Sequence, residues 1–302
     1  HLVCVSRHEL RLARCLPIAA RRCSAVANAL EDLPGGARAR NLPARIVMVA
    51  RMAAPKSPDL LLHALALLRD ETGTEIPATL AGDGPDLAAH QALAQHLGLK
   101  AVEFTGLCTD VPGLLEQHGV FVLLSDHEGL PISVIEAMRA GLAIVASDLP
   151  GLRELLPTPE QGLRVPNDTH AVAAALQRLA HDPTLRTALG QAARERYTQA
   201  YTPAHMAQAV LDVYHHAAID PHPRGSFAVR YQNAVLRWAL AGLLVLMLAY
   251  ALGWWLQGQG WATAQFPATV LWCVIPYAMA TQWLYQGAYL PHFERVSYVV
   301  VA

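Results

Sequence analysis

Short apolar runs alternate with longer amphipathic stretches between Arg45 and about Val165. Runs of this length, several of them with β-branched side chains, are typical of strands buried on both faces of a parallel sheet. Between them, Ser57-Pro58-Asp59 marks a helix start, and Gly98 and Gly141 mark helix ends. The alternation predicts a doubly wound, Rossmann-like α/β domain over residues 41–200. The expected strands are 46–50, 78–81, 102–105, 120–124 and 142–146.

Patterns of a different kind lie on both sides of these units. Residues 1–33 are expected to form a strand, a helix and a short strand, the remnant of a preceding α/β unit. Residues 201–232 are assigned to a C-terminal helix and a linker, because Pro and Gly cluster at 220–225. Further helical stretches are expected at 170–181, 183–198 and 203–217.

The C-terminal segment, 233–302, is strongly apolar. Residues 238–293 contain no charged side chain, which leaves room for two membrane spans at about 238–256 and 266–290. Arginines precede the first span, whereas the loop between the spans has no charge. The positive-inside rule therefore predicts a helical hairpin with both ends in the cytoplasm. The alternative is a buried hairpin in the core of a soluble protein.

Composition and charge restrict the classes of function. The 23 Lys and Arg residues balance 24 Asp and Glu residues, which argues against a strongly basic nucleic-acid binder and an acidic tail protein. The five cysteines are scattered without zinc-ligand spacing, so reduced thiols and no metal site are expected. Because the chain starts at His1 without Met and ends in an apolar run, we expect a fragment that is open at both ends.

Candidate chemistry lies at the carboxyl ends of the expected strands, where a doubly wound sheet binds its ligands. Three clusters stand out: Arg51 and Lys56 after the first strand, Gly106-Leu107 after the third, and Glu128-Gly129-Leu130-Pro131 after the fourth. The last cluster leads into a helix that carries Glu136.

These residue types fit a nucleotide diphosphate attached to a sugar. The backbone of Gly129–Pro131 reaches the start of a helix, whose free N–H groups and dipole favour a phosphate. Arg51 and Lys56 supply two positive charges for the diphosphate. Glu128 and Glu136 only accept hydrogen bonds, which suits sugar hydroxyls on either side of the diphosphate.

In this context the sequence resembles glycosyltransferase family 4, the group 1 glycosyl transferases. The resemblance is to the donor-binding half of the family's two-domain GT-B fold, it covers about residues 1–217, and the Glu128–Glu136 pair matches the family's E-x7-E signature. The matching blocks, in family order, are Val49-Ala50-Arg51-Met52-Ala53-Ala54-Pro55-Lys56, Leu80-Ala81-Gly82-Asp83-Gly84-Pro85, Phe104-Thr105-Gly106 and Glu128-Gly129-Leu130-Pro131 through Glu136-Ala137-Met138.

The resemblance implies a retaining transfer of a sugar from a nucleotide-sugar, without a metal or another cofactor. Glu128 would accept from sugar hydroxyls and Glu136 from the ribose, while Arg51, Lys56 and the backbone of Gly129, Leu130 and Pro131 would hold the diphosphate. Gly106 and Leu107 would contact the base. We take Glu128, Arg51 and Lys56 as the catalytic set.

Two positions depart from the family pattern, since Ala50 and Ser57 stand where it commonly has glycine. Residues 1–33 fit the end of the family's N-terminal acceptor-side domain. The rest of that domain is not in this sequence, so this fragment alone is expected to be inactive.

The resulting expectation is a hexosyltransferase-type enzyme at the inner (cytoplasmic) membrane, with its catalytic domain on the cytoplasmic side. It would act on a lipid-linked or polysaccharide acceptor in bacterial-type exopolysaccharide or cell-surface glycan synthesis, and nucleic acid is not an expected partner. One alternative is a glycosyltransferase fused to a second membrane module, such as a polyprenyl-phosphate sugar-phosphate transferase. The other is a non-catalytic sugar-nucleotide-binding membrane protein.

Overall fold

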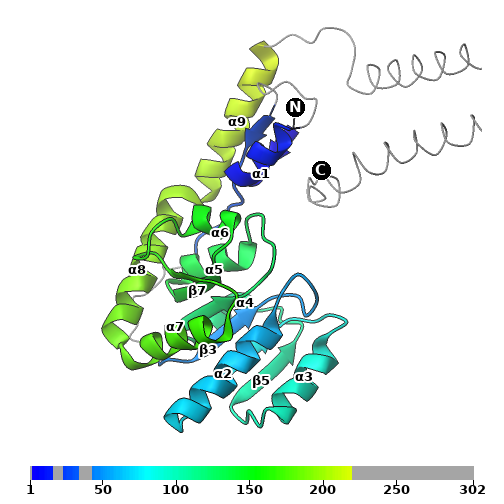
Figure 1. The fold of residues 1–302 in the computed structure, drawn as a ribbon. Coiled ribbons are helices and arrows are strands. Elements are labelled where there is room, and N and C mark those ends of the chain that lie inside the picture. Colours follow the sequence, from blue (N-terminus) through cyan, green and yellow to red (C-terminus); the bar gives the residue numbers. More distant parts are fainter. Residues whose placement is uncertain (1, 16–22, 34–42, 220–302) are drawn as a thin grey trace, which may run out of the picture. The chain divides into compact units, whose positions relative to one another are not determined.

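The computed structural model describes residues 2–15, 23–33 and 43–219, and its described residues up to His216 form one compact unit. Its centre is a six-stranded parallel sheet with the strand order β5-β4-β3-β6-β7-β8 (Figure 1). The strands are β3 (Ile46–Val49), β4 (Ala78–Ala81), β5 (Val102–Gly106), β6 (Val120–Leu123), β7 (Ala143–Ser147) and β8 (Leu163–Val165).

This strand order contains a topological switch point. The chain starts in the middle of the sheet at β3, moves outward through β4 and β5, and then crosses back to β6 on the other side of β3. In a doubly wound sheet the ligand-binding crevice is expected where the order reverses, here at the carboxyl ends of β3 and β6. The doubly wound α/β prediction is confirmed, and the five expected strands are present to within one residue at each end.

Helices cover both faces of the sheet, because right-handed crossovers place the helices of the two half-sheets on opposite sides. On one face α2 packs against α3 and α7, and on the other α5 packs against α4 and α8. These helices, with α6 and α9, are α2 (Pro58–Thr72), α3 (Leu87–His96), α4 (Val111–Leu115), α5 (Ile132–Ala140), α6 (Pro150–Leu155), α7 (Thr169–His181), α8 (Pro183–Ala200) and α9 (Pro203–Ile219).

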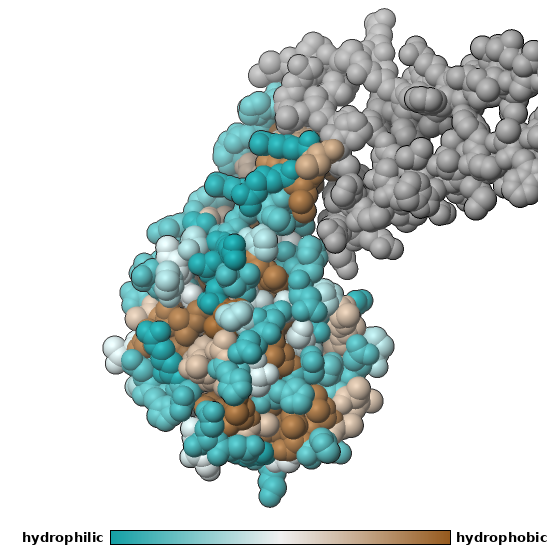
Figure 2. Space-filling model, in the orientation of Figure 1, coloured by the Kyte–Doolittle hydropathy of each residue, from teal (hydrophilic) through white to brown (hydrophobic). Residues whose placement is uncertain are grey.

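The core lies between the sheet and these helices. Every residue of β6 and β7 is buried, as expected for central strands covered on both faces. Tyr197 of α8 is fully buried and belongs to the same core. On the face shown in Figure 2, hydrophilic side chains cover most of the described surface and hydrophobic ones are scattered among them.

Three short elements were not predicted from the sequence. The strand β8 contains only three residues and is interrupted by Arg164, which lowers its apolar signal. The helices α4 and α6 have five and six residues, too few for a periodic pattern. Ser57 does stand at the N-cap of α2, but its side chain makes no capping hydrogen bond.

The N-terminal residues form a small parallel pair of strands with one helix between them: β1 (Leu2–Cys4), α1 (Arg7–Ala13) and β2 (Cys23–Ala25). After β2 the chain runs along α5 and α8. Tyr197 donates a hydrogen bond to Leu30 O at 2.9 Å, and Arg194 donates two, each 2.6 Å long, to the Asp32 carboxylate. The hydrogen bonds from Arg194 hold the pKa of Asp32 below its ordinary value. Residues 30–32 are thus fixed to the Rossmann-like part.

None of the helices in the described part of the chain is both long enough and apolar enough to cross a lipid bilayer. The expected spans at 238–256 and 266–290 lie outside the described residues.

Candidate functional site

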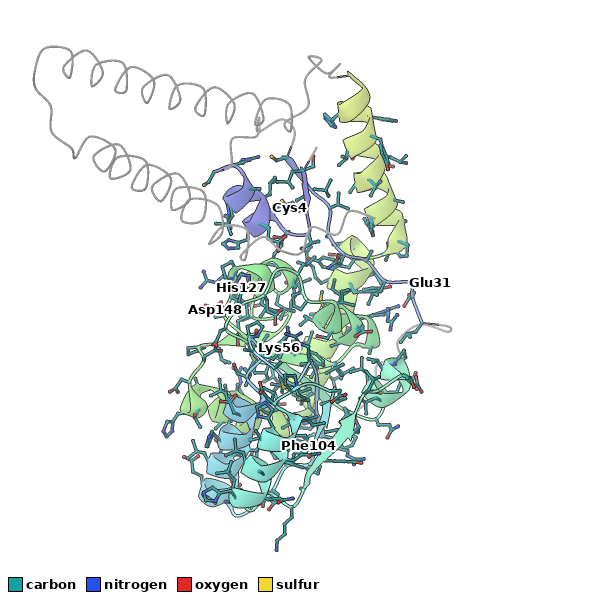
Figure 3. The ribbon with its side chains drawn as sticks, turned by 90° about the vertical axis from the view of Figure 1, so that its right-hand side faces the viewer. Cys4, Glu31, Lys56, Phe104, His127 and Asp148 are labelled. Atoms are coloured by element: carbon teal, nitrogen blue, oxygen red, sulfur yellow. The ribbon has the colours of Figure 1, made fainter. Side chains whose placement is uncertain are left out.

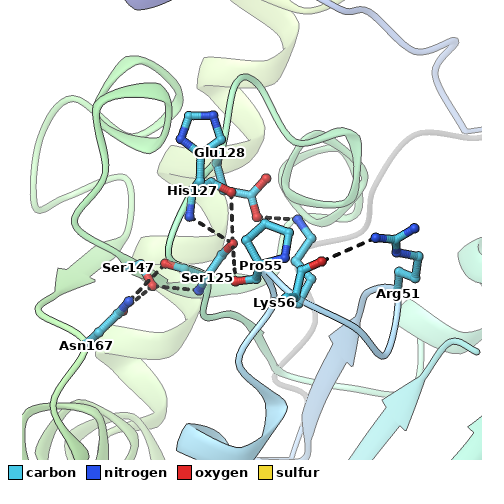
Figure 4. Close-up of polar contacts among 9 residues, drawn as sticks. Arg51, Pro55, Lys56, Ser125, His127, Glu128, Ser147 and Asn167 are labelled. Atoms are coloured by element: carbon cyan, nitrogen blue, oxygen red, sulfur yellow. Dashed lines mark hydrogen bonds and ion pairs between the residues drawn. The ribbon is translucent and has the colours of Figure 1, made fainter. Parts of the chain in front are cut away.

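Two loops meet at the switch point and pair through their main chains. The segment after β3 and the segment after β6 form an antiparallel bridge between Lys56 and Ser125. Ser57 N donates to Leu124 O at 3.0 Å, and Asp126 N donates to Pro55 O at 2.9 Å. This bridge fixes Lys56 beside the β6–α5 loop, residues 125–131 (Figure 4). Figure 3 places Lys56 and His127 together at this end of the sheet.

The bridge brings together two of the residues that the sequence singled out. Lys56 Nζ donates a hydrogen bond to Glu128 Oε1, and the two groups form an ion pair. The Glu128 side chain is only 7% exposed and that of Lys56 is 19% exposed. A buried carboxylate needs such a partner, because an unpaired charge in this environment is strongly destabilising. The pair therefore places a cation and a carboxylate side by side at the carboxyl ends of β3 and β6.

A ring of side-chain hydrogen bonds lies on the other side of the β6–α5 loop. Ser125 N donates to Ser147 Oγ at 3.0 Å, and Ser147 Oγ donates to Asn167 Oδ1 at 2.5 Å. Asn167 Nδ2 returns to the loop, donating to Ser125 O at 3.0 Å and to Asp126 Oδ1 at 3.2 Å. The ring links the carboxyl ends of β6, β7 and β8.

The backbone of the β6–α5 loop is held close to its neighbours just before α5. An added Cβ at Gly151 would lie 1.8 Å from Gly129 O, so only glycine lets α6 approach this closely. Leu130 O accepts a hydrogen bond of 2.9 Å from Asn28 Nδ2, which belongs to the N-terminal segment. The first N–H groups of α5 have no partner within the helix and, with the helix dipole, create a positive potential beside the loop.

Glu136 lies in the second turn of α5. Its side chain is partly buried and accepts no hydrogen bond from any described residue. Burial raises the pKa of this carboxyl, and the nearby Arg139 only partly offsets that shift. A desolvated carboxylate that has no donor in the protein is suited to accepting a hydrogen bond from a ligand hydroxyl.

Arg51 begins the loop that follows β3. Its side chain is exposed, and Nη2 donates to Ala54 O at 3.3 Å (Figure 4). The turn after β4 packs against the same loop, since Met52 N donates to Asp83 O at 3.0 Å. An added Cβ at Gly84 would lie 2.4 Å from Met52 O, and the φ of Gly84 is +159°, which favours glycine. Arg51 therefore stands on a firmly packed turn, with its guanidinium facing solvent.

Gly106 ends the edge strand β5, and Leu107 follows it. Gly106 has a φ of +65°, and its carbonyl accepts a hydrogen bond of 2.8 Å from Gly82 N. Leu107 is 77% exposed. Two strand spacings of roughly 4.8 Å, about 10 Å in all, separate β5, which precedes Leu107, from β3, which precedes the Lys56 loop. A nucleoside diphosphate can span such a separation.

The structure thus brings together Lys56, Glu128, Gly129, Leu130 and Pro131, with Arg51 and Glu136 on the adjoining loop and helix and Gly106-Leu107 farther along the same edge. Sequence reasoning missed Asn28, Ser147, Gly151 and Asn167. Ser147 ends an apolar run and could have been noticed as a polar residue at a strand end. Asn28 and Asn167 sit in loop-like segments that carry no such signal.

The described residues contain no group of three or more His, Cys, Asp or Glu side chains placed to hold a metal ion.

Comparisons with known proteins identify the family. The model of the family "Glycosyl transferases group 1" matches residues 37–196. The EpsD protein of Bacillus subtilis, which carries a provisional glycosyltransferase name, is 33% identical over 174 residues, covering 56% of this chain and 44% of EpsD. The lipopolysaccharide core biosynthesis glycosyltransferase LpsD of Rhizobium meliloti is 33% identical over 137 residues, covering 45% of this chain and 40% of LpsD. The chain thus spans less than half the length of these relatives.

A solved structure agrees with this result at the level of the fold. The Anabaena protein HepE, solved in complex with UDP and glucose, superposes with a TM-score of 0.62 at 17% sequence identity, covering 70% of this chain and 62% of HepE. The sheet and its helices therefore have the α/β, GT-B-like fold of glycosyltransferases. Because the family model covers more than half of the sequence, the chain belongs to the group 1 glycosyl transferases.

Proposed function

We propose that this chain supplies the donor site of a retaining glycosyltransferase that takes its sugar from a nucleotide-diphosphate sugar. The observation that carries the proposal is the Lys56–Glu128 pair at the switch point, directly before the N-terminus of α5. It brings together the Lys56 cation, the Glu128 carboxylate that can accept hydrogen bonds from sugar hydroxyls, and the free backbone N–H groups at the start of α5. Family membership and the UDP and glucose bound to HepE support the same chemistry.

In this proposal the diphosphate lies over the start of α5. The N–H groups of the helix start donate hydrogen bonds to its oxygens, and Lys56 and Arg51 neutralise its charge. Entry of the diphosphate draws the Lys56 ammonium away from Glu128, so that Glu128 becomes free to accept hydrogen bonds from sugar hydroxyls. Glu136 accepts from the ribose, and Gly106 and Leu107 contact the base.

The proposed reaction breaks the bond between the anomeric carbon and the diphosphate oxygen. The nucleoside diphosphate leaves with the electron pair, and its developing charge is stabilised by Lys56, Arg51 and the start of α5. The acceptor hydroxyl attacks from the same face, through front-face attack or a short-lived ion pair, and its proton passes to the leaving oxygen. The sugar is a hexose, and no metal is needed because the cationic side chains neutralise the leaving group.

We further propose a lipid-linked or polysaccharide acceptor in exopolysaccharide or cell-surface glycan synthesis. The name of LpsD, which places that relative in lipopolysaccharide core biosynthesis, supports this class of acceptor. The apolar residues 233–302 would attach the chain to the inner membrane, with the donor site on the cytoplasmic side. Proximity to the membrane would then raise the effective concentration of a lipid-linked acceptor.

Calorimetric titration of the purified chain with UDP and with GDP tests the donor site. We expect binding of at least one nucleotide, and Glu136→Ala should weaken it by roughly 1.5–3 kcal/mol, the scale of a charge-assisted hydrogen bond. Glu195→Ala on the exposed face of α8 is the matched control and should leave the affinity unchanged. The absence of binding heat with both nucleotides would contradict the proposal. So would a Glu136→Ala variant that binds nucleotide as tightly as the wild type.

Membrane attachment has its own test. After carbonate extraction of cells that express the chain, we expect the protein to stay in the membrane pellet. A variant that ends before residue 233 should move to the supernatant. Release of the complete chain into the supernatant would contradict the proposed membrane segment without affecting the donor site.

A further inference from the structure

We propose that Ser147 and Asn167 are positioning residues of the donor site, which hold the β6–α5 loop so that Lys56 meets Glu128 and the incoming diphosphate. The inference rests on the proposed function, because it assigns these side chains to the alignment of that same site. Neither residue reaches the ion pair itself. Both act through the main chain of Ser125 (Figure 4), and Asn167 also bonds the Asp126 side chain.

The ring uses its donors and acceptors in a single consistent direction. Ser147 Oγ accepts from Ser125 N and donates to Asn167 Oδ1. The two protons of the Asn167 amide go to Ser125 O and Asp126 Oδ1. If the amide were reversed, its oxygen would face Ser125 O and the Ser147 proton would lose its acceptor. The ring therefore fixes the position of both polar groups of the Ser125 main chain.

From Ser125 the connection reaches Lys56 directly. Ser125 Oγ lies 3.0 Å from Pro55 O and 2.9 Å from His127 O, between the two loops. On either side of it, the main-chain bonds of the Lys56–Ser125 bridge join the two loops. A shift of Ser125 would therefore move the Lys56 loop against Glu128.

The ring is not needed to hold the sheet together. Ser147 already pairs with Val165 in the ladder between β7 and β8, and Asp148 N donates to Val165 O at 2.8 Å. In the same way, Leu123 pairs with Ala146 between β6 and β7. The side chains of Ser147 and Asn167 instead direct their hydrogen bonds toward the loop, which is what a positioning role requires.

Burial makes the hydrogen bond between Ser125 and Ser147 specific, whereas Asn167 closes the ring from the exposed side. Ser125 is 0% exposed and Ser147 is 1% exposed, so water cannot readily replace a lost partner. Truncation of Ser147 would leave Ser125 N without an acceptor and Asn167 Oδ1 without its donor. The simplest relief is a displacement of residues 125–126 toward solvent, which disrupts the bridge to Lys56.

Hydrogen exchange without any ligand provides the first test. In Asn167→Ala we expect faster exchange of the Ser57 and Asp126 amides, which form the bridge. Thr187→Ala, which removes a hydroxyl bonded only to Pro183 O on α8, is the control and should leave both amides protected. Unchanged protection of Ser57 and Asp126 in Asn167→Ala would overturn the positioning claim, whatever the nucleotide results show.

Nucleotide affinity provides the second test, with UDP and GDP as probes. We expect Asn167→Ala and Ser147→Ala each to weaken binding about five- to tenfold, the ratio given by about one lost hydrogen bond, and Ser147→Thr to restore most of it. If the ring acts through Lys56, Asn167→Ala should have almost no further effect in a Lys56→Ala background.

The outcomes separate the inference from the proposed function. If the wild-type chain binds nucleotide and Lys56→Ala weakens that binding, the proposed function stands. A fully additive loss from Asn167→Ala in the Lys56→Ala background then overturns the positioning role alone. If the wild type binds neither nucleotide, the proposed function fails. The exchange test is independent of that result, because slower or unchanged exchange of the Ser57 and Asp126 amides in Asn167→Ala rejects the positioning role.

Discussion

Two loops at the carboxyl edge of the sheet differ in how firmly they are held. The β6–α5 loop is fixed by the Ser147–Asn167 ring, by the bridge to Lys56, by Asn28 and by the close approach of Gly151. The loop after β5 has few such contacts. The side chains of residues 107–109 make no hydrogen bond to a described residue, and Leu107 is largely exposed.

The difference matches the parts of the proposed donor. The diphosphate and the sugar carry the reacting bond, and catalysis there depends on groups that are already in place. The base takes no part in bond breaking, so the loop that contacts it can be less constrained. We therefore expect changes in the first loop to have large effects and changes in the second loop to have small ones.

The largest effect is expected at Lys56, which follows β3 and is bridged to the β6–α5 loop. Lys56→Ala removes the cation of the diphosphate site and leaves Glu128 buried without its partner. Nucleotide affinity should fall by about 3 kcal/mol, near the upper end for a hydrogen bond to a charged group. Calorimetry with UDP and GDP measures it, and Lys100→Ala at the exposed end of the α3–β5 connection is the control. Equal affinity in the Lys56 variant would remove the distinction between the two loops.

Glycine substitutions compare the two loops through stability. Gly151→Ala forces a Cβ against Gly129 O and should lower the free energy of unfolding by about 2 kcal/mol. Gly106→Ala meets no atom within 4 Å and suffers only from its positive φ, so about 1 kcal/mol is expected. Denaturant unfolding of both variants measures the difference. A Gly106 variant that is the less stable of the two would contradict the comparison.

A pH dependence follows from Glu136. Because burial raises its pKa in the folded chain, the folded state holds this proton more tightly than the unfolded state does. The contribution of Glu136 to stability is therefore complete below its unfolded pKa and is lost as the pH rises through its folded pKa. As the pH rises through this range, the free energy of unfolding measured with denaturant should decline in the wild type. The decline should be smaller in Glu136→Gln. An identical decline in both proteins would exclude Glu136 as its source.

The smallest effect is expected at Leu107. Leu107→Ala removes an exposed side chain that packs against little, so stability should change by no more than about 0.5 kcal/mol. Nucleotide affinity should fall by about 1 kcal/mol or less, because only a contact with the base is lost. Thermal unfolding and calorimetry measure the two quantities. A loss as large as that of Lys56→Ala would show that the base loop, too, is a rigid part of the site.

The sequence was sufficient for most of the fold because its central strands are buried on both faces and glycines follow two of its helices. Gly98 and Gly141 do adopt positive φ values at the ends of α3 and α5. By contrast, β8 is a three-residue edge strand containing Arg164, and no pattern of its length separates it from a loop.

The candidate site was predicted in part for a related reason. Lys56 and Glu128 follow strands that neighbour each other in a doubly wound sheet, so their meeting could be expected from the fold. Asn28 and Asn167 contact the same loop across 102 and 42 residues of sequence, through side-chain hydrogen bonds that no local pattern encodes. Only the three-dimensional arrangement assigns them to the site.

A structure of the chain with UDP bound tests the central claim most directly. We predict the diphosphate at the start of α5, with its oxygens at about 3 Å from the backbone N–H groups there and from Lys56 Nζ. The base should lie toward Leu107, and the bridge between Lys56 and Ser125 should be retained. A nucleotide bound elsewhere, for example in the cavity beside β8 that Asp148, Arg164 and Arg178 line, would contradict the account.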